Sequence, residues 1–177
     1  MKRPVGKLLL LAIIGACNAQ SEEAVRVGIC DLLADPVAWN GKMIEVRAQV
    51  IDSNNFWIMG TECPTRIHAK GTVFIAGFVF GDPQSKNTNA HKVDFRWDLS
   101  NLDRLNAALT RVKETKEQVL ATLLGMFETR VPIENLIDEK APYKFRGFGH
   151  MGSAPGQILI KSLKEVSIEA PTSVRPK

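Results

Sequence analysis

The fold of this chain is decided by the stretch Asn40–Ser53, which reads Asn-Gly-Lys-Met-Ile-Glu-Val-Arg-Ala-Gln-Val-Ile-Asp-Ser. Apolar side chains recur at every second position, and polar or charged side chains alternate with them; the apolar set is Ile44, Val46, Ala48 and Val50. This period is typical of a strand with one buried face and one wetter face. The sequence therefore predicts a long strand over Lys42–Asp52.

Helical turns are expected before this strand and a second strand after it. Asp35 and Pro36 suit the cap and the first position of a short helical turn, which Gly41 would end in a left-handed conformation. Asp52–Asn55 has the composition of a turn, so Phe56–Gly60 is expected to continue a hairpin.

The middle of the chain is expected to contain further strands and one helix. Arg66–Ala69 and Thr72–Phe80 are extended candidates, and the second is apolar enough to be buried on both faces. Leucines at helical spacing predict a helix over Leu102–Val112. Val119–Phe127 is compatible with a longer helix or with a buried strand; Gly125 and the polar break before it favour the strand.

The last strand is expected over Gln157–Glu169. Its apolar residues keep the period of two except at Leu163, which is out of step and indicates a bulge. We expect a single domain over residues 27–170, a polar tether over residues 20–26 and a flexible tail over residues 171–177.

Composition is that of a globular protein and argues against nucleic acid as the partner. The chain has 177 residues, of which 45% are hydrophobic and 24% charged. Lys2, Arg3 and Lys7 lie in the first 19 residues, so 20 basic residues remain against 19 acidic ones after removal of this segment. Nucleic-acid binding requires a concentrated basic face, and this nearly even balance gives no sign of one.

Residues 1–19 have the features of an export signal. Basic residues precede the short apolar core Leu8–Ile14, and small residues follow it. The run Ile14-Gly15-Ala16-Cys17 resembles a bacterial lipobox, and this resemblance implies lipidation of Cys17 and cleavage before it. Ordinary cleavage after Ala19 is the alternative. The chain is thus expected in the periplasm, either free or as an outer-membrane-anchored lipoprotein; full secretion is the further alternative.

Cys30 and Cys63 would remain after either cleavage. Two cysteines in an oxidising compartment are most simply joined by a disulfide bond, which would pin the segment before the first strand across the end of the hairpin. A redox-active or metal-binding pair is the alternative, but the Cys-x-x-Cys spacing typical of such sites is absent from the sequence.

The expected order of elements resembles an OB-fold barrel, as found in small exported bacterial domains without an assigned activity. The resemblance rests on Leu33–Pro36 with Gly41–Val50, on Leu120–Glu128, and on Gly147–Gly152 leading to Ile158–Ile168. It implies a mainly β, five-stranded barrel with one helix between strands three and four and a short helical turn before strand one.

Motifs for cofactor or metal chemistry are weak. Gly147–Gly152 fits the dinucleotide pattern G-x-G-x-x-G, but Ser153–Gly156 after it opens a strand instead of the required helix, so we interpret it as a tight glycine loop. The three histidines, His68, His91 and His150, are too scattered to predict a metal site. We expect neither a metal nor a cofactor.

Candidate ligand-binding residues are Arg47, Phe56, Trp57, Arg66 and, in the glycine loop, His150. The aromatic and basic residues resemble the face on which OB domains stack ligands. The alternative is that the aromatic side chains belong to the core and the arginines are merely solvated. An envelope protein, a peptide or a glycan is the expected partner.

Three functions are compatible with this sequence. The first is a non-enzymatic binding or envelope-interaction module. The second is a structural or accessory lipoprotein that holds another envelope protein through the apolar segment Val73–Phe80. The third is an exported hydrolase that uses His150.

Overall fold

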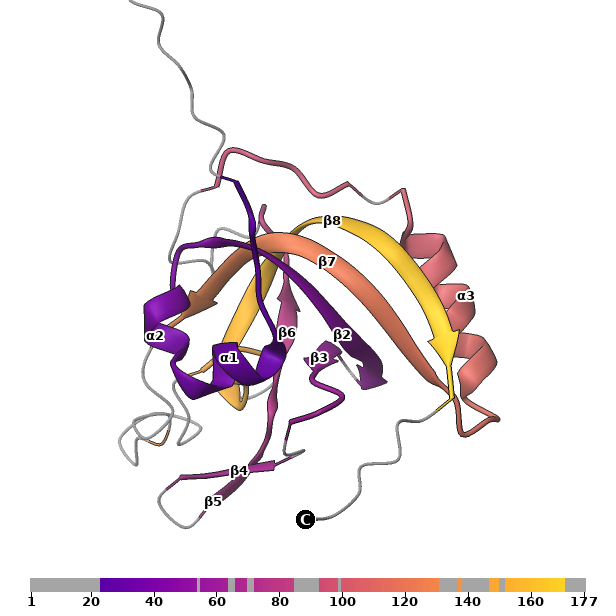
Figure 1. The fold of residues 1–177 in the computed structure, drawn as a ribbon, viewed down its shortest axis with the longest axis horizontal. Coiled ribbons are helices and arrows are strands. Elements are labelled where there is room, and N and C mark those ends of the chain that lie inside the picture. The colour runs from indigo at the N-terminus through magenta and orange to yellow at the C-terminus, as the bar shows by residue number, and fades with distance from the viewer. Residues whose placement is uncertain are drawn as a thin grey trace, which may run out of the picture.

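The computed structural model describes residues 23–53, 55–63, 66–69, 72–84, 93–98, 100–130, 137, 147–149 and 152–170. The predictions made for the export signal, Cys17, His91, His150 and the tail lie outside these residues. Within the described part, the chain is mainly β, with a six-stranded mixed sheet, a two-stranded sheet and three helices (Figure 1).

The elements follow one another in the chain with these bounds: β1 Val25–Arg26, α1 Ile29–Ala34, α2 Pro36–Trp39, β2 Met43–Ser53, β3 Asn55–Met59, β4 Arg66–Ala69, β5 Thr72–Ile75, β6 Gly77–Gly81, α3 Leu102–Val112, β7 Gln118–Thr129 and β8 Gly156–Glu169. The expected strands near residues 42–52, 56–60 and 157–169 and the expected helix at 102–112 are confirmed. Residues 119–127 form a strand, as the sequence favoured.

The main sheet has the order β1-β2-β3-β6-β8-β7, and β7 pairs with β2 as well. The five strands from β2 to β7 therefore form a ring of pairings. The pair β6–β8 is parallel, as is β1–β2, and the other pairs of the ring are antiparallel. In Figure 1, β7 and β8 arch side by side, and α3 lies beside their ends, away from α1 and α2.

The expected plan of five strands, one helix and one helical turn is wrong in its count and in the placement of helices. A sixth strand, β1, lies within the stretch predicted as a tether and pairs with β2. Two helices, α1 and α2, precede β2, where the resemblance implied one short helical turn; α3 lies between the sixth and seventh strands of the chain, β6 and β7, and not between the third and fourth. The segment Val73–Phe80 is divided between β5, which pairs with β4, and β6, which pairs with β3 and β8.

Local capping explains the two short helices. The Asp31 carboxylate accepts a hydrogen bond from the Gly28 amide at 3.1 Å, at the start of α1. The Asp35 carboxylate accepts a hydrogen bond from the Ala38 amide at 3.1 Å, and Pro36 occupies the first turn of α2. Gly41 follows with a φ of 79°, a conformation that glycine adopts at little cost, and the chain turns into β2.

The core lies inside the ring. Alternate residues of β2 are buried there, as the pattern predicted, and include Ile44, Val46, Ala48 and Val50. Phe78 and Phe127 pack edge to face with ring centroids 4.9 Å apart. From α3, Leu105 and Leu109 enter the same core, and their burial against the sheet explains why this helix forms beside it.

Two bulges in β8 explain why Leu163 is out of step. At the first bulge, Gly125 of β7 pairs with Ile160 and Leu124 with Ser162, which leaves Lys161 as an extra residue of β8. At the second bulge, Leu123 pairs with Leu163 and Thr122 with Glu165, which leaves Lys164 as the extra residue. Each bulge adds one residue to the period of two. Ile160, Leu163 and Val166 are consequently all buried, although they are three residues apart.

A disulfide bond joins α1 to the segment after β3. The sulfur atoms of Cys30 and Cys63 lie 2.02 Å apart and their Cα atoms 5.4 Å apart, in agreement with the predicted bridge. Ile29 and Cys63 are both buried in the main core. The bond therefore fixes the two helices before β2 against the hairpin that β2 and β3 form.

Candidate functional site

Arg47 projects from the outer face of β2, opposite to the buried residues. Its guanidinium donates hydrogen bonds to Glu165 at 3.0 Å, to Ser167 Oγ at 3.0 Å and to Glu169 at 2.6 Å. All three acceptors lie on β8, and Arg47 reaches them across β7, where Thr122 pairs with both Arg47 and Glu165. Arg47 is therefore held in place by β8.

A second ion-pair group lies further along the same outer face. The Glu45 carboxylate accepts hydrogen bonds from Arg26 of β1, at 2.8 Å, and from Lys164 of β8. The hydrogen bond from Lys164, with the positive charges of Lys164 and Arg26, holds the pKa of Glu45 below its ordinary value of 4.5, although burial acts in the opposite direction. Glu45 is thus the centre of a three-strand contact.

The second bulge of β8 places Lys164 and Glu165 on the outer face together. Side chains of consecutive strand residues normally point to opposite faces, but the extra residue of a bulge breaks that alternation. Both side chains are exposed, while Leu163 before them and Val166 after them are buried. As a result, Lys164 contacts Glu45 and Glu165 contacts Arg47.

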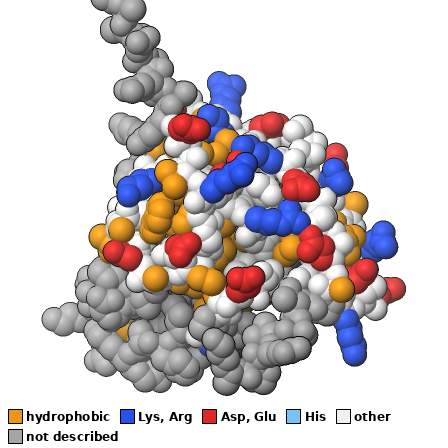
Figure 2. Space-filling model, viewed as in Figure 1, with side chains coloured by type: hydrophobic (Ala, Val, Ile, Leu, Met, Phe, Trp, Pro, Cys, Tyr) orange, Lys and Arg blue, Asp and Glu red, His pale blue; other side chains and the backbone are white. Residues whose placement is uncertain are grey.

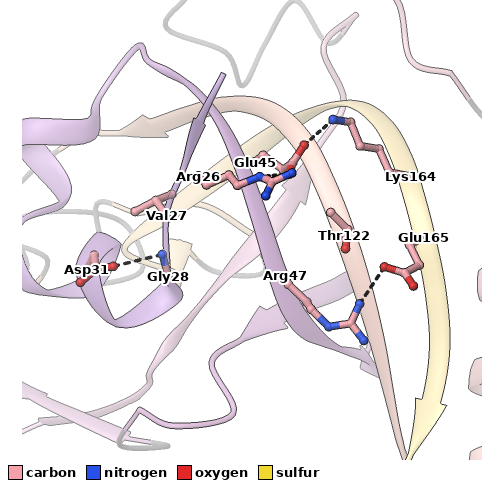
Figure 3. A pocket seen from close by; sticks show the side chains of 9 residues that line it. All are labelled: Arg26, Val27, Gly28, Asp31, Glu45, Arg47, Thr122, Lys164 and Glu165. Carbon is pink, nitrogen blue, oxygen red and sulfur yellow. Dashed lines mark hydrogen bonds and ion pairs between the residues drawn. The ribbon is translucent and has the colours of Figure 1, made fainter. Parts of the chain in front are cut away.

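These side chains surround an open hollow of about 730 Å³. Its lining consists of Arg26, Val27, Gly28, Asp31, Glu45, Arg47, Thr122, Lys164 and Glu165 (Figure 3). The charged members are three cations and three carboxylates, so the hollow carries both signs in balance. Figure 2 shows the same intermixing of basic and acidic side chains over the visible face of the described part.

The structure separates the two aromatic residues predicted to bind a ligand. Phe56 lies on the inner face, where its ring centroid is 5.3 Å from that of Phe80. Trp57 lies on the other face, pairs with Ile51 and Val79, and is only 8% exposed. Neither residue lines the hollow around Arg47.

The described part of the glycine loop covers Trp57. Phe148 packs with Trp57 and Val79 in a second small apolar cluster, and the Arg130 guanidinium lies 4.4 Å from the Phe148 ring centroid. Gly149 has a positive φ, and paired hydrogen bonds between Phe148 and Ala154 close the loop. This arrangement fits the interpretation of Gly147–Gly152 as a tight loop.

The other sequence candidates lie apart from the hollow or outside the described residues. Arg66 is exposed and lies on β4 of the two-stranded sheet, where it pairs with Ile75. The hydrolase hypothesis depends on His150, which lies outside the described residues. For the accessory hypothesis, Ala76, Phe78 and Val79 are buried within the fold and do not form an exposed patch.

Two further findings on the described residues concern metal binding and membrane crossing. No group of three or more His, Cys, Asp or Glu side chains in this part of the chain is placed to hold a metal ion. Of the helices described, none combines the length and the apolar character needed to cross a membrane.

The sequence identified Arg47 but not the residues around it. Glu45 could have been found, because it lies two positions from Arg47 on the same polar face of β2. Sequence reasoning could not have found Arg26, Lys164 or Glu165, because their positions depend on the pairing of β1 with β2 and on the bulge in β8.

In comparisons with known proteins, no family model, no curated protein and no solved structure matched this chain. The fold and the side chains of the hollow therefore carry the functional inference.

Proposed function

We propose that this chain is an exported, non-enzymatic interaction module built on an OB-like barrel. Its binding site is the hollow around Arg47 and Glu45, and its partner is a segment of an envelope protein or peptide that carries both acidic and basic side chains. The observation that carries the proposal is the balanced set of charged side chains around an open hollow of about 730 Å³.

The pairing of strands supports the OB-like barrel. In the ring, β2, β3 and β6 are followed by α3 and then by β7 and β8, and the ring closes through the β2–β7 pair. Five strands that close on themselves with one helix before the fourth ring strand agree with that barrel architecture. β1, α1, α2 and the β4–β5 hairpin are additions to it.

The exposure of the ion pairs supports exchange with a partner. The side chains of Arg47 and Glu165 are 41% and 63% exposed. The two side chains that pair with Glu45 are also exposed, Arg26 by 88% and Lys164 by 48%, whereas Glu45 itself is 13% exposed. Exposed ion pairs contribute only about 0–1 kcal/mol each, so a partner that offers equivalent charges can replace them at little cost. A neutral glycan could not replace these contacts, which favours a protein or peptide.

The leader and the disulfide bond support export. Residues 1–19 have the pattern of an export signal. Disulfide bonds persist mainly in oxidising compartments, and Cys30 and Cys63 lie at bonding distance. We propose that the domain resides in the periplasm or is anchored to the outer membrane through lipidated Cys17.

Site-specific photo-crosslinking in cells that export the protein tests the binding site. A photo-reactive residue at Thr122, within the hollow, is expected to capture a discrete protein partner. The same residue at Asn106, an exposed position of α3 that does not line the hollow, is the matched control. Reversal of two charges, with Glu45→Lys and Arg47→Glu, should abolish the crosslink.

Two results would contradict the proposal. One is the absence of any specific crosslink from Thr122. The other is a partner that crosslinks equally from Thr122 and Asn106 and is unaffected by the charge reversals.

A further inference from the structure

A second hollow, of about 420 Å³, lies between α3 and the end of β8. Its lining consists of Arg104, Ala107, Ala108, Arg111, Val166, Ser167 and Ile168. Unlike the hollow around Arg47, this groove has cations as its only charged lining residues within the described part of the chain.

Arg104 and Arg111 lie on one face of α3, two turns apart. At a rise of about 1.5 Å per residue, seven residues separate them by roughly 10 Å along the helix. Both side chains belong to exposed residues, and neither has an ion-pair partner among the described residues. Two arginines without an ion-pair partner among the described residues therefore extend into the same groove from helix positions two turns apart.

Small and apolar side chains form the floor between the two arginines. Ala107 and Ala108 of α3 leave room for an approaching chain, and the buried Val166 of β8 forms part of the groove floor. The hydroxyl of Ser167 is engaged by Arg47 and Glu169. The groove thus combines a short apolar floor with a positive group toward each end.

We infer that this groove binds an acidic peptide segment, with two carboxylates about 10 Å apart and small apolar residues between them. A guanidinium binds a carboxylate through two parallel hydrogen bonds, which supplies both attraction and orientation. A peptide in the polyproline II conformation has three residues per turn and advances about 3.1 Å per residue, so glutamates three positions apart lie on one face about 9 Å apart and match the arginine spacing.

A lipid surface fits the groove less well than a peptide. Membrane-surface binding requires exposed apolar side chains that enter the acyl region in addition to cations. The large hydrophobic residues that are exposed in the described part are Val25 and Val37, on β1 and α2. Neither lies at this groove.

Fluorescence anisotropy with a labelled peptide tests the inference directly. The probe has two glutamates separated by two alanines; the control probe has glutamines in place of the glutamates. We expect saturable binding of the glutamate probe, and about tenfold weaker binding with either Arg104→Gln or Arg111→Gln, because each change removes one charge-assisted contact. Binding should also weaken as salt is raised.

The matched control variant is Arg96→Gln, which removes an exposed arginine that does not line the groove. Equal melting temperatures of all variants would show that folding is intact. The inference is overturned if the glutamate probe fails to bind, or if Arg96→Gln weakens it as much as Arg104→Gln does. It is also overturned if phosphatidylglycerol vesicles, and not the peptide, bind in an arginine-dependent way. These variants do not change a residue that lines the hollow around Arg47, so their results test the groove and not the proposed function.

Discussion

Arg47 of β2 and Glu165 of β8 form an ion pair of 3.0 Å that crosses the intervening strand β7. The two residues are 118 positions apart in the sequence and face each other because Thr122 pairs with both. Their side chains are 41% and 63% exposed. The pair thus connects two strands of the ring while remaining open to water, which is the property that the proposed binding site requires.

A double-mutant cycle measures how firmly this contact is held. Arg47→Gln, Glu165→Gln and the double variant should each change the free energy of unfolding by less than about 1 kcal/mol, with a coupling energy of about 0.5 kcal/mol, as exposed pairs usually do. Urea denaturation at neutral pH provides the measurement. A coupling above about 2 kcal/mol would show that the pair is too strong to be exchanged with a partner and would count against the proposed function.

The pH dependence of stability tests the role of Glu45. Its pKa is lowered in the folded state, chiefly by Lys164, so the folded protein holds the ionised form more strongly than the unfolded chain does. This contribution is fully present above the unfolded pKa and disappears as the pH falls through the folded pKa. We therefore expect Glu45→Gln to lower the melting temperature at pH 7, and the difference from wild type to shrink as the pH falls below about 4.5 and to vanish at a pH below the lowered pKa of the folded state.

Glu114→Gln is the control for this experiment. Glu114 is exposed and has no ion-pair partner among the described residues. Its substitution should change the melting temperature by a small amount that is the same at pH 7 and at low pH. A difference for Glu45→Gln that persists undiminished at low pH would refute the proposed cause.

The strand β2 was predictable because its signal is local. Alternation of Ile44, Val46, Ala48 and Val50 with polar residues needs no knowledge of the rest of the fold. The same rule could have separated Phe56 from Trp57, since adjacent residues of a strand point to opposite faces. The expectation that both would share one ligand-binding face neglected it.

The site was only partly predictable because its contacts are long-range. Arg47 could be chosen as a charged residue on the wetter face of β2, but its acceptors are more than 100 positions away. Leu163 indicated a bulge in β8. That signal could not show that the bulge brings Lys164 and Glu165 onto the same face as Glu45, because this depends on the register with β7.

Removal of the disulfide bond should destabilise the domain without changing its fold. The bond closes a loop of 33 residues between Cys30 and Cys63. In the chain-entropy model, the double variant Cys30→Ser, Cys63→Ser should lose about 3–4 kcal/mol in the free energy of unfolding. Urea denaturation with and without reductant measures the loss. Reductant should affect the wild type and leave the double variant unchanged; equal stabilities of the two proteins in oxidising buffer would contradict the prediction.

Lipidation of Cys17 is tested by labelling with radioactive palmitate. If Cys17 is the anchor, the label should enter the wild-type protein and be lost completely in Cys17→Ser. Cys63→Ser is the matched control, because Cys63 lies in the folded domain and pairs with Cys30. A wild-type protein without label, processed after Ala19, would refute the anchor.

Gly125 of β7 is the position where the close approach of β7 and β8 leaves no room for a side chain. A Cβ atom built there would lie 2.3 Å from the Leu159 carbonyl oxygen and 2.9 Å from a methyl group of Ile158. The carbonyl belongs to the backbone of β8, so the two strands would have to separate next to the first bulge. We expect Gly125→Ala to cost about 2 kcal/mol or more, measured by urea denaturation.

Thr122→Ala is the control on the same strand. Thr122 is half-buried on the outer face, and its truncation should cost less than about 1 kcal/mol. Because β7 pairs with both β2 and β8, Gly125→Ala should weaken both pairings. Amide exchange should therefore accelerate in β2 as well as in β8. Equal stabilities of Gly125→Ala and Thr122→Ala would show that the backbones of β7 and β8 do not approach closely at Gly125.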